Sequence, residues 1–438
     1  MIATKVLQTA ELSDMPINNK DTKGTLNNKK INEYELNRNN IEKMGKIVRV
    51  TDTDSDNEIE ILSVNKSDSE SSNLSRQCRG LVFNKDKLIV QGFPFAYEFT
   101  HKALEQDSAA SILYSPIFKN IRFFDAIEGC LIRMFYFKNK WYTSTHRKLN
   151  AFKSKWMSKD SFGVTFKQAL NIEVNNNTIL RNSLPVTDEN LLSRFQLTLD
   201  KSKQYMFLVK NNEDNRVVCR TSSEHNLYHV GTFVNGKLSL DENINIPKPK
   251  EHHFESVEEL TDYIDNLDIY ELQGIICFTP ENTQLKIFNA TYLELFNVRG
   301  NQPSIKFRYL QVRMKNRLVE MLIHLYPNYT EIFGEIENNL YEIGKGIYNS
   351  YVQRYIKKRF ITVPREEFSV MKQCHLWHEA DRSTNRISIE KVLTVLNDQT
   401  PTSLNKMLRR LKVEQIKKNQ ENEKSRDKIR SITEENFE

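Results

Sequence analysis

Four short segments of the chain carry residue types suited to phosphate chemistry. Each combines a strand-like run with a cation, a glycine or a polar pair beside it. Cationic side chains neutralise phosphate oxygens and stabilise the charge that spreads over them during group transfer. In chain order the segments are Arg76–Phe83 with Gly92–Phe95, Asp125–Arg133 with Trp141–Lys148, Tyr205–Leu208 with Asp214–Val218, and Glu271–Ile276 with Leu285–Asn289.

Strands have to position these segments. Between Cys78 and Phe307, short apolar runs alternate with turn signals, and Phe137–Trp141 has the pattern of a hairpin turn. One helix is expected in this region, over 257–267. The pattern predicts a mixed α+β domain built mainly on antiparallel strands.

The character of the sequence changes after Pro303. Apolar residues then recur at helical spacing, which predicts an all-helical C-terminal half. The expected helices cover 308–325, 329–355, 365–378, 387–396 and 403–416. The chain is therefore expected to divide into a flexible polar tail over 1–32, a strand-rich domain over 33–307, a helical domain over 308–416 and a charged tail over 417–438.

The composition favours a cytoplasmic protein with no membrane segment. The chain has 438 residues, of which 39% are hydrophobic and 27% charged, and a formal net charge of +6. No apolar run approaches the roughly 20 residues of a membrane helix, and the N-terminus lacks the apolar stretch of a signal peptide. The five scattered cysteines favour reduced thiols over a disulfide framework.

The ordered segments resemble the motifs of the covalent nucleotidyltransferases, which comprise ATP-dependent DNA and RNA ligases and mRNA capping enzymes. The likeness is greatest to phage-type RNA ligases, where an Arg-Gly strand precedes a Lys-x-Asp-Gly motif, followed by an Asn-Arg turn, a Glu-Gly strand and a Lys-x-Lys strand. It covers residues 76–310, and the helical half by architecture alone. The resemblance implies an antiparallel-sheet nucleotidyltransferase domain, of the ATP-grasp-like ligase kind, followed by an all-helical C-terminal domain.

The resemblance also implies a chemistry. The motif lysine of these enzymes attacks the α-phosphate of ATP and forms a lysyl-AMP phosphoramidate, so it must lose its proton first. In this chain the lysine position holds Ala126, followed by Glu128 and Gly129 for the Asp-Gly pair. Alanine has no lone pair to offer phosphorus, so lysyl-AMP cannot form at Ala126.

The remaining site residues follow from the same resemblance. Three motif positions depart from the pattern, because Met206 and Gln273 stand where glutamates are expected and Phe288 replaces the second lysine of the last motif. The expected nucleotide-binding residues are Arg79, Arg147, Lys148, Arg216, Gln273 and Lys286. On the residues alone, Arg79 could equally be a surface arginine, and Lys286 a solvent-facing strand lysine.

Three functions remain open on this basis. The first is an RNA-ligase-like protein, a pseudoenzyme, that binds RNA or a nucleotide without adenylyl transfer. The second is an active RNA ligase in RNA end repair, using ATP and Mg²⁺ with a relocated nucleophile such as Lys119 or Lys148. The third is a non-catalytic subunit of a viral-type RNA-processing or transcription assembly.

RNA is the expected partner, and a protein partner is the alternative. Basic clusters over 299–317, 354–359 and 406–418 contain interleaved aromatic residues, which suits contact with an RNA backbone. No metal site is expected. His375 and His378 lie one helical turn apart, but no second Cys or His pair follows at zinc-finger spacing.

Overall fold

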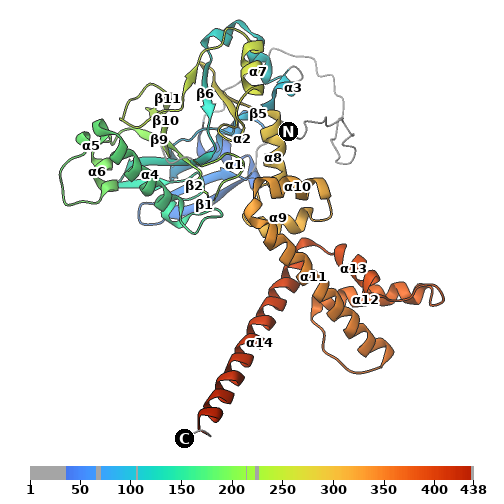
Figure 1. Ribbon diagram of the computed structural model, residues 1–438. Coiled ribbons are helices and arrows are strands. Elements are labelled where there is room, and N and C mark those ends of the chain that lie inside the picture. Colours follow the sequence, from blue (N-terminus) through green and yellow to red (C-terminus); the bar gives the residue numbers. More distant parts are fainter. Residues whose placement is uncertain (1–35, 66–70, 105–106, 214, 222–225, 436–438) are drawn as a thin grey trace, which may run out of the picture.

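A computed structural model describes residues 36–435, except 66–70, 105–106, 214 and 222–225. Figure 1 shows a strand-rich body, followed by a helical region from which the last helix projects. The tail expected over 1–32 lies outside the described residues.

An N-terminal antiparallel sheet has the strand order β1-β2-β3-β4. Its buried face packs Leu62, Leu81 and Phe83 against the short helices α1 and α2. The elements of this part are α1 (Arg38–Glu42), the 3₁₀ turn η1 (Gly45–Ile47), β1 (Val48–Asp54), β2 (Ile59–Val64), α2 (Asn73–Gln77), β3 (Arg79–Asn84) and β4 (Lys87–Val90). The Arg-Gly segment predicted as a strand thus begins β3.

Two five-stranded sheets follow, with orders β11-β10-β9-β7-β8 and β12-β6-β13-β14-β5. All their described pairings are antiparallel except that of β14 with β5. The strands are β5 (Tyr97–Thr100), β6 (Arg122–Ala126), β7 (Gly129–Phe137), β8 (Lys140–Ser144), β9 (Gln204–Lys210), β10 (Leu227–Val234), β11 (Lys237–Ser239), β12 (Glu251–His252), β13 (Gly274–Phe278) and β14 (Gln284–Phe288).

Apolar residues from both sheets fill the space between them. Phe124 of β6 and Phe278 of β13 share one cluster with Met206 of β9 and Phe233 of β10. Because side chains alternate along a strand, the opposite faces form separate cores. Helix α4 covers one of these faces and helix α7 the other.

Helices within the strand-rich body are more numerous than the sequence indicated. The expected helix over 257–267 is α7 (Val257–Asp265), but α4 to α6 were not predicted. Helix α4 begins after Ser161, whose side chain accepts a hydrogen bond from Val164 N, and buries Phe166 and Leu170 one turn apart. The other helices here are α3 (His101–Leu104), η2 (Ala110–Tyr114), η3 (Pro116–Asn120), η4 (Ala151–Lys153), α4 (Phe162–Asn176), α5 (Thr178–Ser183) and α6 (Leu191–Leu197).

The C-terminal region is helical, as predicted, and shares one core with α8 of the strand-rich body. The single helix expected over 308–325 is two helices, α9 and α10, and α14 continues without a break at 416. The elements are α8 (Ala290–Arg299), α9 (Ile305–Val312), α10 (Asn316–Leu325), η5 (Pro327–Tyr329), α11 (Thr330–Tyr351), the π-helical η6 (Val352–Ile356), α12 (Arg365–Ala380), α13 (Ile389–Asn397) and α14 (Pro401–Glu435). Antiparallel sheets followed by helices confirm the predicted fold class.

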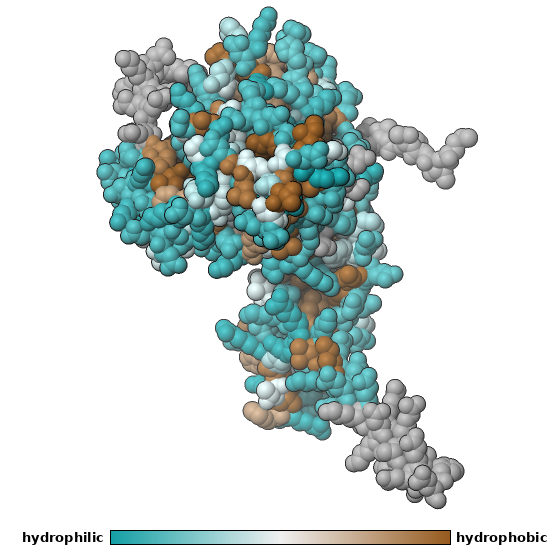
Figure 2. Space-filling view, turned by 90° about the vertical axis from the view of Figure 1, so that its left-hand side faces the viewer, coloured by the Kyte–Doolittle hydropathy of each residue, from teal (hydrophilic) through white to brown (hydrophobic). Residues whose placement is uncertain are grey.

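The surface agrees with the composition. Hydrophilic side chains cover most of the face seen in Figure 2, with small hydrophobic areas between them. Across residues 36–435, outside the gaps given above, no helix is both long and apolar enough to cross a membrane.

Candidate functional site

Three predicted site residues meet where β6, β13 and β14 lie side by side. Ala126 pairs with Gly274, and its carbonyl accepts a hydrogen bond from Gln273 N at 2.9 Å. From the next strand, Lys286 Nζ donates a hydrogen bond to the side-chain oxygen of Gln273. The ammonium group of Lys286 therefore lies beside Gln273, whose backbone is hydrogen-bonded to Ala126 at the motif lysine position.

Arg79 joins this group from β3. Its guanidinium centre lies 5.2 Å from the centroid of the Phe95 ring, and Nη1 donates to Pro94 O at 3.4 Å. Burial lowers the pKa of Arg79, and the nearby carboxylate of Glu98 opposes that shift. Glu98 is the register partner of Lys286 on the parallel strand β5 and is exposed. The predicted Arg79 and Lys286 therefore face one shared carboxylate.

The side chain of Lys286 has a lowered pKa. Burial lowers the pKa of Lys286 to about 8, and the positive charge of Arg79 acts in the same direction. The carboxylates of Glu98 and Glu128 raise the pKa and offset part of that shift. Lys286 is thus mostly protonated at neutral pH and loses its proton near pH 8.

Arg133 and His146 also belong to this site and were not predicted as site residues. Arg133 on β7 is only 2% exposed; Nη2 donates to Thr145 O at 2.8 Å, while Nη1 donates to Gly80 O. Burial lowers the pKa of Arg133 to about 9, and Arg79 contributes to the shift. Burial, with Arg79 and Arg133, lowers the pKa of His146 to about 3, so that ring is neutral. The position of Arg133 within an otherwise apolar strand was the sequence signal that could have identified it as a site residue.

Both carboxylate oxygens of Glu128, which the motif placed in the site, are engaged by protein donors. Its buried carboxylate accepts hydrogen bonds from five donors. These bonds connect the start of β7 to the loop after β9 and to α8. The donors are Val217 N (2.7 Å), Val218 N (2.9 Å), Cys219 N (3.1 Å), Asn211 Nδ2 (3.1 Å) and Tyr292 Oη (3.1 Å). The contacts describe an anchor between the strand-rich body and the helix that leads into the helical region.

These contacts bear on metal binding. Mg²⁺ prefers free carboxylate oxygens, and both oxygens of Glu128 already accept protein donors. Gln273 is neutral and engages Lys286. Within the part of the chain that the structure describes, no group of three His, Cys, Asp or Glu residues is arranged to hold a metal ion. The donor set around Ala126 therefore does not fit a divalent metal.

Gly129 has a steric reason to be glycine. A Cβ atom at this position would lie 2.3 Å from Val209 O on the paired strand β9. That distance is far inside van der Waals contact, so β7 and β9 can approach only because the side chain is absent. The close approach of β7 and β9 is therefore sufficient to require glycine at position 129.

We expect Gly129→Ala to lower the free energy of unfolding by about 2 kcal/mol, since either the strands separate or Val209 shifts. Urea denaturation of the full chain measures this change. Gly334→Ala is the matched control, because a Cβ on that helix glycine meets no atom within 4 Å. An unchanged midpoint for Gly129→Ala would contradict the steric explanation.

The side chains of three predicted nucleotide-binding residues bond to partners outside this group. Arg147 Nη2 donates to Asn65 O at 3.1 Å, and Lys148 pairs with Asp52 at 3.2 Å, so both face the N-terminal sheet. Arg216 bonds to the carbonyls of Val218 and Leu325 at the edge of the helical region. These contacts do not bring the three residues to the group formed by Ala126, Arg79 and Lys286.

Apolar side chains occupy the other departed motif positions. Met206 is 2% exposed and packs among the phenylalanines between the two sheets. Phe288 is 7% exposed and its ring lies 4.6 Å from Lys286 Nζ. Lys119, one proposed replacement nucleophile, is exposed on η3, and Lys148 is held by Asp52. Lys286 is the lysine that these contacts place nearest to the vacated position.

Some cations of the basic clusters in the helical region are used within the fold. Arg299 is fully buried and bonds to Tyr326, while Arg313 pairs with Glu337 and Arg410 with Glu366. A paired cation releases fewer counterions when it meets a phosphate. In the strand-rich site the three cations Arg79, Arg133 and Lys286 have the two carboxylates Glu98 and Glu128 near them, so positive charge is in excess there.

The chain is similar to several viral proteins, although no protein-family model matches it. It is 31% identical over 359 residues to an immediate-early protein ICP-46 homologue of Invertebrate iridescent virus 6, a match covering 77% of each chain. It is 24% identical over 261 residues to ICP-46 of Frog virus 3, covering 57% of this chain and 62% of the relative.

A proposed bifunctional polynucleotide kinase/RNA ligase of Autographa californica nuclear polyhedrosis virus is 26% identical over 237 residues, covering 52% of this chain and 31% of the relative. This match confirms the predicted resemblance to RNA ligases. Two solved structures, a proposed ATP-dependent DNA ligase from Aquifex aeolicus and an archaeal ATP-dependent RNA ligase, each give a TM-score of 0.37. They are 13% and 12% identical, covering 68% and 69% of this chain and 78% of each structure. At 31% identity over most of both chains, the iridovirus match is sufficient to assign the chain: it belongs to the family of the immediate-early protein ICP-46.

Proposed function

We propose that this protein binds RNA through a ligase-type site and does not transfer adenylyl groups. One observation carries the proposal: one buried and two half-buried cations gather beside a position that lacks its nucleophile. Arg79, Arg133 and Lys286 supply the cations, and Ala126 is the vacated position. Such a site retains the means to hold a phosphate and has lost the atom that would attack one.

The energetics of the cations support this assignment. Burying a cation costs free energy unless an anion accompanies it, and neighbouring cations add repulsion. Both arginines also retain a buried Nε without a hydrogen-bond partner among the described residues. A phosphodiester supplies negative charge and acceptor oxygens together, so it would offset both costs.

An adenylylation assay tests the inactive assignment. The full chain is incubated with α-labelled ATP and Mg²⁺ or Mn²⁺, denatured, and examined for covalent label. We expect none, because Ala126 has no lone pair and the surrounding residues do not fit a divalent metal. Labelled wild-type protein would contradict the proposal.

A second candidate function is an active RNA ligase, and one observation favours it. Lys286 Nζ lies beside Gln273, and burial lowers the pKa of this lysine to about 8. Deprotonated Nζ would attack the α-phosphorus of ATP; the bond to the bridging oxygen would break, pyrophosphate would leave, and solvent would take the proton. In that case the label would map to Lys286 and disappear in Lys286→Met, whereas Lys138→Met, a change of an exposed hairpin lysine, would keep it.

A further inference from the structure

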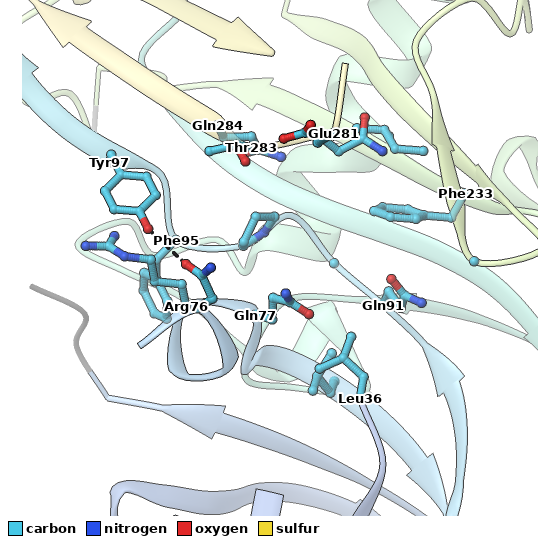
Figure 3. Close-up of a pocket in the computed structure, with 17 residues that line it drawn as sticks. Leu36, Arg76, Gln77, Gln91, Phe95, Tyr97, Phe233, Glu281, Thr283 and Gln284 are labelled. Carbon is cyan, nitrogen blue, oxygen red and sulfur yellow. Dashed lines mark hydrogen bonds between the residues drawn. The ribbon is translucent and has the colours of Figure 1, made fainter. Parts of the chain in front are cut away.

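A hollow lies beside the cationic site formed by Arg79, Arg133 and Lys286, between the N-terminal sheet and the two larger ones. Figure 3 shows side chains from α2, from residues 91–97 and from the turn between β13 and β14 gathered around it. Its volume is about 270 Å³, just below the roughly 300 Å³ at which small-molecule pockets begin. The hollow therefore suits one small group and not an extended ligand.

Carboxamides dominate the polar lining of this hollow. Gln77, Gln91, Asn282 and Gln284 each present an amide, which combines donors and an acceptor. Gln284 is only 3% exposed, yet its Nε2 has no hydrogen-bond partner among the described residues. A buried donor without a partner costs free energy, and a ligand acceptor would remove that cost. The lining thus fits a neutral ligand with both donors and acceptors.

Aromatic rings complete the wall. The hydroxyl of Tyr97 donates to Asn73 Oδ1 at 3.0 Å, which fixes the ring beside the hollow (Figure 3). The guanidinium centre of Arg76 lies 3.7 Å from the centroid of that ring, and Arg76 also donates to Ala96 O at 3.3 Å. Phe95 adds a second ring.

We propose that this hollow takes an unstacked nucleobase. A base is planar, stacks on aromatic rings and carries donors and acceptors on its edge, which are the features that the lining complements. A phosphate or a sugar acid would need an excess of positive charge, but the lining contains one arginine, Arg76, and one carboxylate, Glu281, among its amides.

The position of the hollow links it to the cationic site. Phe95 lines the hollow, and the guanidinium centre of Arg79 lies 5.2 Å from the centroid of the Phe95 ring. Tyr97 in the hollow and Glu98 beside Lys286 are consecutive residues. A nucleotide seated here would direct its backbone toward Arg79. This assignment rests on the proposed function, and it deepens that function by naming the nucleobase as the part of the RNA that the hollow binds.

Fluorescence of a single-stranded oligoribonucleotide containing one 2-aminopurine tests the proposal on the full chain. We expect a change in base fluorescence on binding, because the base leaves its stack for the aromatic wall. Tyr97→Ala and Gln284→Leu should each weaken binding by about tenfold without altering its salt dependence. Tyr114→Ala, at an exposed tyrosine outside the hollow, should change affinity less than twofold.

Several outcomes distinguish the alternatives. If a free nucleoside monophosphate displaces the labelled oligonucleotide, a mononucleotide can also supply the base. If only an unlabelled oligonucleotide displaces it, the base must come from an RNA strand. If RNA binds but neither the fluorescence nor the two variants respond, the hollow is not a base site while the proposed function stands. If RNA does not bind at all, the proposed function fails first. Tyr97→Phe keeps the ring and loses only the hydrogen bond to Asn73, so it should bind RNA more tightly than Tyr97→Ala, which guards against a loss caused by misfolding.

Discussion

Replacing Glu128 by glutamine is expected to lower the free energy of unfolding by about 3 kcal/mol or more. The carboxylate accepts five hydrogen bonds, three of them from consecutive backbone N–H groups. A glutamine of the same shape offers one acceptor oxygen and turns an NH₂ group toward donors, so several buried N–H groups lose their partner. The loss should appear as a lower urea midpoint.

The same substitution should loosen the join between the two parts of the chain. Glu128 holds Tyr292 of α8, which leads into the helical region. We therefore expect the unfolding of the helices to separate from that of the sheets in far-ultraviolet and near-ultraviolet circular dichroism. Glu255→Gln is the matched control, because that side chain is 76% exposed, and its midpoint should not move. A stable Glu128→Gln protein would show that the carboxylate is not an anchor and would restore a role for it in the site.

Much of the sheet architecture could be predicted because alternation along a strand is local. Lys286 lies between Leu285 and Ile287, which both enter the core, so period-two alternation already placed the lysine on the opposite face. The structure brings Lys286 together with Arg79, as the order of the motifs implied. Local pattern and motif order were sufficient for these two residues.

Other parts of the site depend on contacts that no local pattern contains. Arg147 and Lys148 stand in a segment dense in phosphate-friendly groups, yet Asn65 and Asp52, more than 80 positions away, determine where they point. Arg133 enters the site because its guanidinium donates to the carbonyl of Gly80, which belongs to a strand of another sheet. The direction of a long side chain is set by its tertiary neighbours, and the sequence does not state which neighbours those are.

The role of Glu128 shows the same limit in another form. Its motif position suggested catalysis, while the structure supplies it with five donors from the loop after β9 and from α8. The sequence shows that a carboxylate precedes Gly129, but the loop that saturates this carboxylate lies some 90 residues further along the chain. A motif match therefore identifies which residue occupies a position more dependably than it identifies what that residue does.

Removing the charge of Arg79 or Lys286 is expected to weaken RNA binding by about tenfold for each residue, since a hydrogen bond from a charged group to a phosphate contributes roughly 1.5–3 kcal/mol. Arg79→Met and Lys286→Met keep most of the side-chain volume. Titration of single-stranded RNA at several salt concentrations should also show a log–log slope that is shallower by about 0.7 for each lost contact. Lys138→Met, on an exposed hairpin, is the matched control and should leave both quantities unchanged.

The acidity of Lys286 gives this binding a pH dependence whose sign follows from linkage. Its pKa is about 8 in the free protein against an ordinary value of 10.5, and a bound phosphate would raise it, so binding takes up a proton above pH 8. RNA affinity should therefore fall as the pH rises above about 8, and Lys286→Met should remove that fall. Stability of the free protein should move the other way, rising between about pH 8 and 10.5, because the unfolded chain binds more protons there. If Lys286→Met lowered stability and left RNA affinity intact, this lysine would be a structural residue, and the anion site would have to lie elsewhere.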